Sequence, residues 1–380
     1  MYFQHRIKTF DPSVFISKLN SSVNLADSSP VEDEFVPKNS FDSFSVPDQL
    51  KKNIASRGYT RLTPIQDEVI PQILDGRDVV GVANTGTGKT AAFLIPLIAK
   101  IFAERGQRVL IIAPTRELAV QIRDELAGFS MGLNIDSVLA IGGVNIYPQI
   151  QRLRRNPQFV IGTPGRLIDL EGNRAINFAS FQNIVLDEVD RMLDIGFARE
   201  IKYMIARLPQ NRQTLFFSAT LTVTVTDIMR TLLRNPVMIS VKSTETLAKV
   251  KQNVLKMNGK PKIEALHELL IKQEFTKVLV FGRTKFGVEK LARDMDRRGF
   301  KVAAIHGNKN QSQRQRAIND FKNNYVQVLM ATDVAARGLD INDVSHVINY
   351  DLPESFEDYI HRIGRTGRAN KSGVALTFVE

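Results

Sequence analysis

The chain has 380 residues, 43% of them hydrophobic and 24% charged, a size and composition typical of a globular protein with two domains. Its formal net charge of +11 is compatible with a polyanionic partner, although a basic surface without such a partner explains the charge equally well. The absence of Cys excludes disulfides and thiolate metal sites, and no apolar run approaches the roughly 18 residues of a membrane-spanning helix. The N-terminus lacks the apolar core of a signal peptide, so we expect a cytoplasmic protein without a membrane partner.

Residues 1–40 are predicted to form a flexible N-terminal extension. Positions 20–40 are rich in Ser, Pro and acidic groups, and such a stretch buries too little apolar surface to offset its ordering entropy. From residue 41 onward, continuously apolar runs alternate with amphipathic segments, which is typical of a parallel sheet with helices on both faces. In the first half, strands are expected at 78–82, 109–113, 159–162, 184–186 and 214–217, with a helix at 116–127.

The same pattern restarts in the second half of the chain. Strands are expected at 278–281, 302–305, 326–330, 347–349 and 374–378, and helices at 261–273, 284–298 and 313–321. The polar stretch 242–252 between the two blocks is predicted to be a linker. The sequence thus predicts two tandem α/β domains, 41–241 and 253–380, each with a mostly parallel sheet and with a ligand in the cleft between them.

A glycine-rich segment, ANTGTGKT at residues 83–90, follows the first expected strand and precedes an apolar helix. In this context backbone N–H groups can surround phosphates at the helix N-terminus, whereas a glycine-rich turn alone is more often structural. Lys89 is expected to reach the β and γ phosphates, and the Thr90 hydroxyl to ligate Mg²⁺. The residues predicted to bind the phosphates are Thr85, Gly86, Thr87, Gly88, Lys89 and Thr90.

Two adjacent carboxylates end the expected strand 184–186. Asp187 is predicted to hold Mg²⁺, largely through water, and Glu188 to position and deprotonate the attacking water. An isolated acidic cluster is usually solvated surface, but its place at the end of an apolar strand favours catalysis. These two segments predict a bound nucleotide and Mg²⁺.

With DEVD at residues 187–190, the sequence resembles the DEAD-box family of RNA helicases over about 41–380. The fold that this implies is two tandem RecA-like domains with ATP in the cleft between them. Val189 stands where the family usually has Ala. The segment YTRLTPIQ at 59–66, with Phe41 upstream, is similar to the adenine-reading motif of the family. Gln66 is implied to pair with the edge of adenine, and Tyr59 to pack on the base.

The resemblance assigns further roles at the nucleotide. Asp190, Ser218, Thr220 and His361 are implied to couple hydrolysis to unwinding. Arg365 and Arg368 of HRIGRTGR are implied to act as arginine fingers, because a planar, permanently charged guanidinium suits the charge of the transition state. Gly338 and Asp340 of ATDVAARGLD are implied to lie at the ribose or to orient these arginines.

The resemblance also implies an RNA path across both domains. It contacts backbone rather than bases, so we expect low sequence specificity and salt-sensitive binding. Each contributing segment, taken alone, is an ordinary helix cap or turn. The implied RNA contacts are Pro114, Thr115, Arg116, Gly143, Thr163, Gly165, Arg166, Arg283, Thr284, Gly307, Gln311, Arg314 and Thr332.

The function that the resemblance implies is ATP-dependent unwinding or remodelling of RNA duplexes or RNA–protein complexes by a monomer. Two alternatives stay open: an ATP-dependent RNA clamp or scaffold with little turnover, and a DNA-directed helicase with the same two domains. The segments VFGRTK at 280–285 and IHGNK at 305–309 are similar to bacterial RhlE-type members. That similarity suggests RNA turnover or ribosome assembly, with ribonucleoprotein partners.

Overall fold

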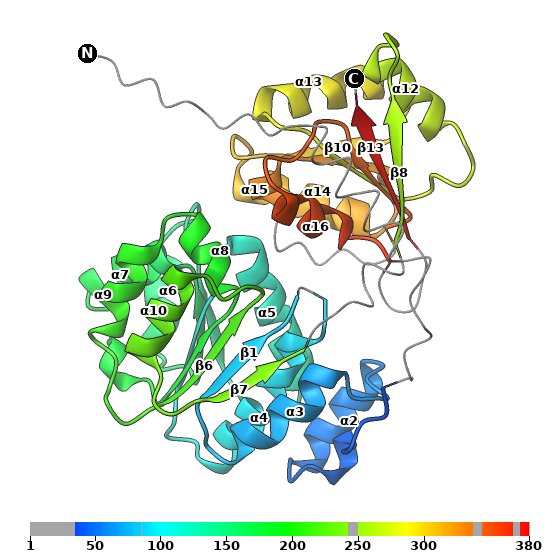
Figure 1. Cartoon of the computed structure of the whole chain (residues 1–380). Coiled ribbons are helices and arrows are strands. Elements are labelled where there is room, and N and C mark those ends of the chain that lie inside the picture. Colours follow the sequence, from blue (N-terminus) through cyan, green and yellow to red (C-terminus); the bar gives the residue numbers. More distant parts are fainter. Residues whose placement is uncertain (1–34, 85, 242–249, 337–343, 368–372, 380) are drawn as a thin grey trace. The chain divides into compact units, whose positions relative to one another are not determined.

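The structure is a computed structural model that describes residues 35–84, 86–241, 250–336, 344–367 and 373–379. The chain separates into two compact units, one of residues 34–243 and one that includes residues 244–380. We call them the first and the second domain (Figure 1). Four of the predicted site residues, Thr85, Gly338, Asp340 and Arg368, lie outside the described residues.

The first domain is built on a seven-stranded parallel sheet with the order β3-β4-β2-β5-β6-β1-β7. All five strands predicted for this half are present, with bounds that differ from the expected ones by two residues or fewer, whereas β3 and β7 were not predicted. The strands are β1 (Val79–Val82), β2 (Val109–Ile112), β3 (Ser137–Ala140), β4 (Phe159–Gly162), β5 (Asn183–Leu186), β6 (Gln213–Ser218) and β7 (Val237–Ser240).

Helices cover both faces of this sheet, as predicted (Figure 1). Successive strand residues belong to different core clusters: Val185 packs with α3, α4 and α5, and Ile184 packs with α7 to α10 on the other face. The helices are η1 (Phe41–Ser43), α2 (Asp48–Ser56), α3 (Pro64–Leu74), α4 (Lys89–Ala103), α5 (Arg116–Phe129), α6 (Tyr147–Leu153), α7 (Pro164–Gly172), η2 (Phe178–Ser180), α8 (Val189–Asp194), α9 (Ala198–Ile205) and α10 (Val223–Leu232).

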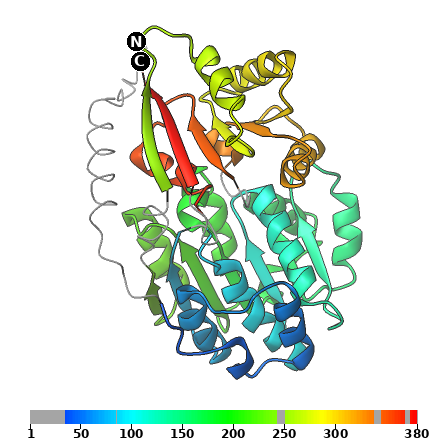
Figure 2. The ribbon, with the colours of Figure 1, turned by 90° about the vertical axis from the view of Figure 1, so that its right-hand side faces the viewer.

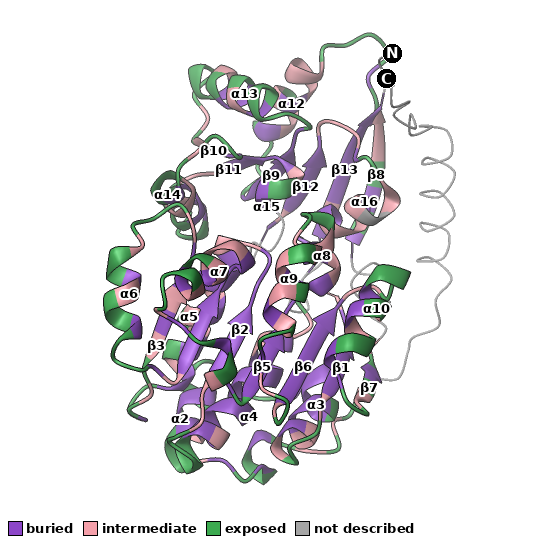
Figure 3. Ribbon diagram, turned by 90° about the vertical axis from the view of Figure 1, so that its left-hand side faces the viewer, coloured by how far each residue is buried: buried purple, intermediate pink, exposed green. Residues whose placement is uncertain are grey.

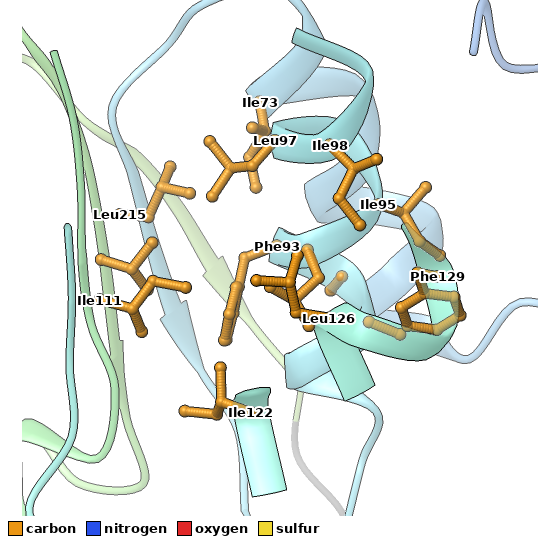
Figure 4. Close-up of a cluster of buried hydrophobic side chains, with 14 of the residues drawn as sticks. Ile73, Phe93, Ile95, Leu97, Ile98, Ile111, Ile122, Leu126, Phe129 and Leu215 are labelled. Carbon is orange, nitrogen blue, oxygen red and sulfur yellow. The ribbon is translucent and has the colours of Figure 1, made fainter. Parts of the chain in front are cut away.

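Helix α4, which follows the phosphate loop, is buried almost all the way round. Phe93 at its centre is fully buried and lies among Ile111, Ile122 and Leu215, with its ring 5.4 Å from that of Phe217 (Figure 4). Such close packing leaves a helix little freedom to shift. The phosphate loop is therefore held in place at its C-terminal end, where it enters α4.

The second domain has a six-stranded parallel sheet with the order β10-β11-β9-β12-β13-β8, and its strands are largely buried (Figure 3). The five predicted strands are present, and β8 starts within the segment predicted as a linker; it pairs with β13 over seven residues (Figure 2, yellow-green and red arrows). Helices α12 and α13 pack on one face and α14 and α15 on the other. The elements are β8 (Val250–Lys256), α12 (Lys262–Leu270), β9 (Val278–Phe281), α13 (Lys285–Arg297), β10 (Val302–Ile305), α14 (Gln311–Lys322), β11 (Val328–Ala331), α15 (Asp333–Ala336), β12 (His346–Asn349), α16 (Phe356–Ile363) and β13 (Gly373–Val379).

The predicted fold class, two α/β domains with parallel sheets, is confirmed. No helix among the described residues is long and apolar enough to span a membrane. Residues 35–40, part of the stretch predicted to be a flexible extension, are described and contact the first domain through α3.

Arg362 of α16 is 2% exposed and joins several segments of the second domain. Its Nε and Nη2 donate to the two carboxylate oxygens of Asp333 at 2.6 and 2.7 Å. Its Nη1 donates to Asn349 Oδ1 at 3.1 Å and to the Asp351 carbonyl oxygen at 2.7 Å, and the guanidinium lies 5.0 Å from the Phe281 ring centroid. Arg362 therefore fixes the helix in which the motif HRIGRTGR begins.

We predict that Arg362→Lys destabilises the second domain by about 2–4 kcal/mol, because an ammonium cannot reproduce the paired bonds and leaves buried acceptors without donors. Hydrogen exchange in peptides from β9 and β12, followed at increasing urea, measures the loss for this domain alone. Arg298→Lys is the matched control, since Arg298 makes the same paired contact with Glu264, at 2.6 and 2.9 Å, on the surface. Water competes for that exposed pair, so the control is expected to change little. Equal losses of stability in the two variants would contradict the role of Arg362 as a buried support of α16.

Candidate nucleotide and RNA sites

The phosphate loop leaves the sheet at the end of β1. Ala83 N donates to the Ser218 carbonyl oxygen at 3.1 Å, and Gly86 and Gly88 have φ values of +86° and +92°, a region that favours glycine. Lys89 is 6% exposed, and its Nζ donates to the Ala83 carbonyl oxygen at 2.7 Å. The lysine ammonium thus lies inside the loop, where phosphate oxygens are expected.

Gln66 joins the predicted adenine-reading segment to this loop. Its Oε1 accepts from Thr63 N at 3.0 Å, and its Nε2 donates to the Gly88 carbonyl oxygen at 3.2 Å. A Cβ added to Gly88 would lie 2.5 Å from Gln66 Nε2. The backbone conformation therefore favours glycine at position 88, and a Cβ there would also displace the Gln66 carboxamide.

Tyr59 and Phe41 lie together in the first domain. Their ring centroids are 6.2 Å apart in an edge-to-face arrangement, and Tyr59 also contacts the Phe129 ring at 5.3 Å. The Tyr59 hydroxyl donates to Glu125 Oε1 at 2.5 Å. The residue predicted to pack on the base is thus held by two rings and a carboxylate, a support that sequence reasoning did not find.

Asp187 directly follows β5 and is 2% exposed. Its Oδ1 is buried and accepts no hydrogen bond from any described group. Burial raises the pKa of Asp187 to about 7, the nearby ammonium of Lys89 opposes this rise, and the carboxylate of Glu188 adds to it. A buried oxygen ligand without a donor suits a divalent cation, so Asp187, with half-buried Thr90 in the first turn of α4, fits the predicted role in holding Mg²⁺.

Glu188 has a left-handed backbone conformation, with φ +52° and ψ +55°, which is uncommon outside glycine and asparagine. Its Oε2 accepts from Arg191 Nη1 at 2.8 Å, and the two side chains are 7% and 9% exposed. Arg191 was not predicted, although the spacing of three residues at a helix start was visible in the sequence. The pair fixes where the Glu188 carboxylate lies.

Asp190 connects the acidic segment of β5 to the end of β6. Its Oδ2 accepts from Ala219 N at 2.9 Å and from Thr220 N at 3.0 Å, and the Thr220 hydroxyl lies at 3.3 Å. Asp190 N donates to the Ser218 hydroxyl at 3.4 Å. The structure thus brings together three of the predicted coupling residues, and the fourth, His361, lies on α16 in the second domain.

The first-domain RNA candidates lie where β2, β3 and β4 end, and these strands are neighbours in the sheet. The guanidinium of Arg116 rests against Gly142 and Gly143, so closely that a Cβ on Gly143 would collide with it. Arg166 Nη2 donates to the Val144 carbonyl oxygen at 3.1 Å. The remaining candidates belong to the same turns: Pro114, Thr115, Thr163 and Gly165.

The second-domain RNA candidates follow β9, β10 and β11, which are also neighbours. Thr284 caps α13 by accepting from Gly287 N at 3.0 Å, and Arg283 N donates to Asp351 Oδ2 at 2.9 Å. Both line a pocket of about 490 Å³. The other candidates are Gly307 after β10, Gln311 and Arg314 in α14, and Thr332 after β11.

Of the predicted second-domain nucleotide contacts, Arg365 is described and is 4% exposed. Its backbone N–H donates to the Arg362 carbonyl oxygen at 3.2 Å, at the end of α16. The backbone of Arg365 is thus joined to the end of α16.

We predict that Gly88→Ala weakens ADP binding at least about tenfold, because an L residue is strained at this φ and its Cβ collides with Gln66. Titration calorimetry with ADP and Mg²⁺ measures the affinity. Gly58→Ala is the matched control: Gly58 also has a positive φ, +80°, but nothing within 4 Å of an added Cβ. Similar weakening in both variants would show that the contact with Gln66 is unimportant.

Val189 is fully buried and belongs to the core cluster that also contains Leu186, Phe216 and Val225. We predict that Val189→Ala, which restores the usual DEAD motif, lowers the stability of the first domain by about 1–2 kcal/mol by removing two buried methyl groups. ATP hydrolysis should persist, since the Asp190 bonds do not involve this side chain. Urea-dependent hydrogen exchange in peptides of β5 and β6 measures the change. A gain in stability would mean that valine is strained here.

Two family models match the chain: one described as DEAD/DEAH box helicase over residues 63–228, and one described as Helicase conserved C-terminal domain over residues 261–370. ATP-dependent RNA helicase CshA of Listeria monocytogenes is 43% identical over 342 residues, which are 90% of this chain and 66% of that protein. DEAD-box ATP-dependent RNA helicase CshA of Bacillus subtilis is 42% identical over 341 residues, 89% of this chain and 69% of that protein. The chain thus spans about two thirds of the length of these relatives.

Solved structures agree with these relatives. S. cerevisiae Dbp5 bound to RNA and ADP BeF3 matches with a TM-score of 0.80 and 31% identity, covering 90% of this chain and 89% of that one. A DEAD box protein from Methanococcus jannaschii matches with a TM-score of 0.55 and 36% identity, covering 90% and 94%. The similarity to RhlE-type members stays a prediction. Both domains have the RecA-like fold of these proteins, and the chain belongs to the DEAD-box family of ATP-dependent RNA helicases.

Proposed function

We propose that this chain is an RNA-stimulated ATPase that unwinds or remodels RNA duplexes or RNA–protein complexes locally. One observation carries the proposal: in the first domain a single edge of the parallel sheet carries the phosphate loop and the acidic segment at β1, β5 and β6, and the turns with Arg116 and Arg166 at β2, β3 and β4. A nucleotide and an RNA backbone can therefore bind the same rigid sheet side by side.

The chemistry assigned to the chain uses its own side chains. Lys89 exchanges its bond with the Ala83 carbonyl oxygen for phosphate oxygens of ATP. Glu188, held by Arg191, positions the attacking water and accepts its proton. Thr90 and Asp187 hold Mg²⁺, which neutralises charge on the phosphates when bound.

The second domain supplies the remaining charge. We assign Arg365 and Arg368 as arginine fingers at the γ phosphate, Gly338 and Asp340 as contacts at the ribose, and His361 as a coupling residue. If ATP and RNA each favour the closed pair of domains, each must raise the affinity for the other by the same factor. Hydrolysis removes the γ phosphate, reopens the domains and releases the RNA.

The nucleic acid in this proposal is RNA, bound mainly through phosphates and sugars by turns rich in backbone N–H groups. Dbp5, the solved relative bound to RNA and ADP BeF3, supports the choice. Discrimination from DNA would come from the 2′-hydroxyl. We further propose a cytoplasmic monomer with ribonucleoprotein or ribosome-assembly partners.

We predict that single-stranded RNA stimulates steady-state ATP hydrolysis at least about tenfold more than DNA of matched sequence. Lys89→Ala and Glu188→Gln should each lower the stimulated rate by about 100-fold or more, because one removes the phosphate cation and the other the base. Lys202→Ala, at an exposed position of α9, is the matched control and should behave as the unchanged chain.

The outcomes separate the alternatives. Equal stimulation by DNA and RNA would favour the DNA-directed helicase. An unchanged chain that hydrolyses almost no ATP, yet retains RNA when ATP is present, would favour the clamp. Hydrolysis that survives in Glu188→Gln would overturn the role of this carboxylate.

A further inference from the structure

We propose that Asp67 is a positioning residue for nucleotide binding: its carboxylate anchors the incoming segment 38–41 on α3 and thereby holds Phe41 against Tyr59. The inference rests on the proposed use of ATP and deepens it. Asp67 takes no part in the chemistry and touches no phosphate in this proposal. It acts through the aromatic residues predicted to lie at the adenine.

The Asp67 carboxylate is 3% exposed and both of its oxygens are used. Oδ2 accepts from Lys38 N at 2.8 Å. Oδ1 accepts from Asn39 N at 3.0 Å and from Asn39 Nδ2 at 2.8 Å. Hydrogen bonds to an ionised acceptor are roughly twice as strong as neutral ones. A buried carboxylate thus fastens a segment that lies 28–29 residues earlier in the chain.

The anchored segment leads directly to Phe41. Ser40 and Ser43 cap the short helix η1 reciprocally, with Ser43 N donating to Ser40 Oγ at 3.2 Å and Ser40 N donating to Ser43 Oγ at 3.1 Å. Phe41, the first residue of η1, is 7% exposed and meets Tyr59 edge to face. The direction of the Phe41 ring is therefore set by two supports, the serine caps and the Asp67 carboxylate.

Asp67 directly follows Gln66, whose side chain bonds Gly88 of the phosphate loop. The two residues share the first turn of α3, the helix that packs beside α4 in Figure 1. One helical turn therefore joins the aromatic segment to the phosphate loop. Loss of the Asp67 anchor should act on the base end of the nucleotide and leave the phosphate end intact.

The physical effect can be isolated with Asp67→Asn. Asparagine has almost the same shape, but one of its two terminal groups is a donor and would face another donor. The segment 38–41 would then be ordered in only part of the molecules, and the apparent affinity for the nucleotide falls by that fraction. The maximal rate at saturating ATP should stay nearly unchanged, because Lys89, Glu188 and their supports are untouched.

The test compares the full chain with its Asp67→Asn and Glu68→Gln variants. Glu68 is the matched control, since it neighbours Asp67 but pairs with the Lys38 ammonium, at 3.3 Å, on the surface. Steady-state hydrolysis of ATP and GTP with saturating RNA gives KM and kcat, and hydrogen exchange of residues 36–42 reports the anchor directly. For Asp67→Asn we expect a KM for ATP about 5–20-fold higher, a kcat within about twofold and a weaker preference for ATP over GTP. Glu68→Gln should match the unchanged chain.

Two results would overturn the proposal. One is faster exchange at 36–42 in Asp67→Asn with an unchanged KM for ATP. The other is an equal fall of kcat/KM for ATP and GTP, carried by kcat, which a merely structural role would give. If Asp67→Asn does not fold, Asn39→Ala removes one of the three donors and should raise KM by a smaller factor.

Failure of the proposed function would look different. If the unchanged chain hydrolyses no ATP, the affinity for ADP measured by calorimetry replaces KM. An Asp67→Asn variant that then binds ADP more weakly than Glu68→Gln still supports the anchor, and equal affinities overturn it.

Discussion

The nucleotide site depends on one costly burial, that of the Asp187 carboxylate at the end of a strand that is itself inside the core. An isolated carboxylate loses several kcal/mol of hydration when it leaves water, and the pKa of Asp187 rises to about 7 for that reason. The Lys89 ammonium offsets part of the cost, but it is buried as well and is bonded to the loop carbonyl of Ala83. In our proposal, Mg²⁺ and the phosphates of ATP supply the remaining charges that Asp187 and Lys89 interact with. The site is therefore shaped for a ligand that carries both.

Strand order decides which groups can cooperate. Because β5, β6 and β1 are consecutive in the first sheet, the acidic segment, the segment 218–220 and the phosphate loop end side by side. Asp190, which accepts hydrogen bonds from Ala219 N and Thr220 N, joins the segment after β5 to the segment after β6. The turns with Arg116 and Arg166 lie at the carboxyl ends of β2, β4 and β3, the strands on the other side of β5 in the same sheet. The candidate nucleotide residues and the candidate RNA residues of this domain thus meet where β5 pairs with β2 in one sheet.

Sequence patterns predicted the bounds of the central strands to within two residues, because a continuous apolar run is stable only inside a core. They did not predict β3, β7 and β8, which are edge strands without a continuous buried run: buried residues alternate with half-buried ones in β3, and exposed residues interrupt β7 and β8. In the proposed site, motif spacing predicted roles for Lys89, Asp187 and Glu188. Motif spacing could not predict the hydrogen bonds that support the site. The bond of Gln66 to Gly88, for example, depends on how α3 packs beside α4. The anchor at Asp67 joins positions that are distant in the chain and carries no local pattern.

In our proposal, one glutamine in the first turn of α3 contacts both the phosphate loop and the base. A carboxamide has two acceptor lone pairs and two donor hydrogens. In Gln66 one lone pair is used by Thr63 N and one hydrogen by Gly88, which leaves one of each for the donor and acceptor edge of adenine. Gln66 is 1% exposed, so the atoms that cover it must move before a base can pair. If adenine binds as proposed, its pairing and the position of the phosphate loop are linked through the Gln66 side chain. A base that cannot pair with Gln66 would not regain the free energy spent on moving those atoms.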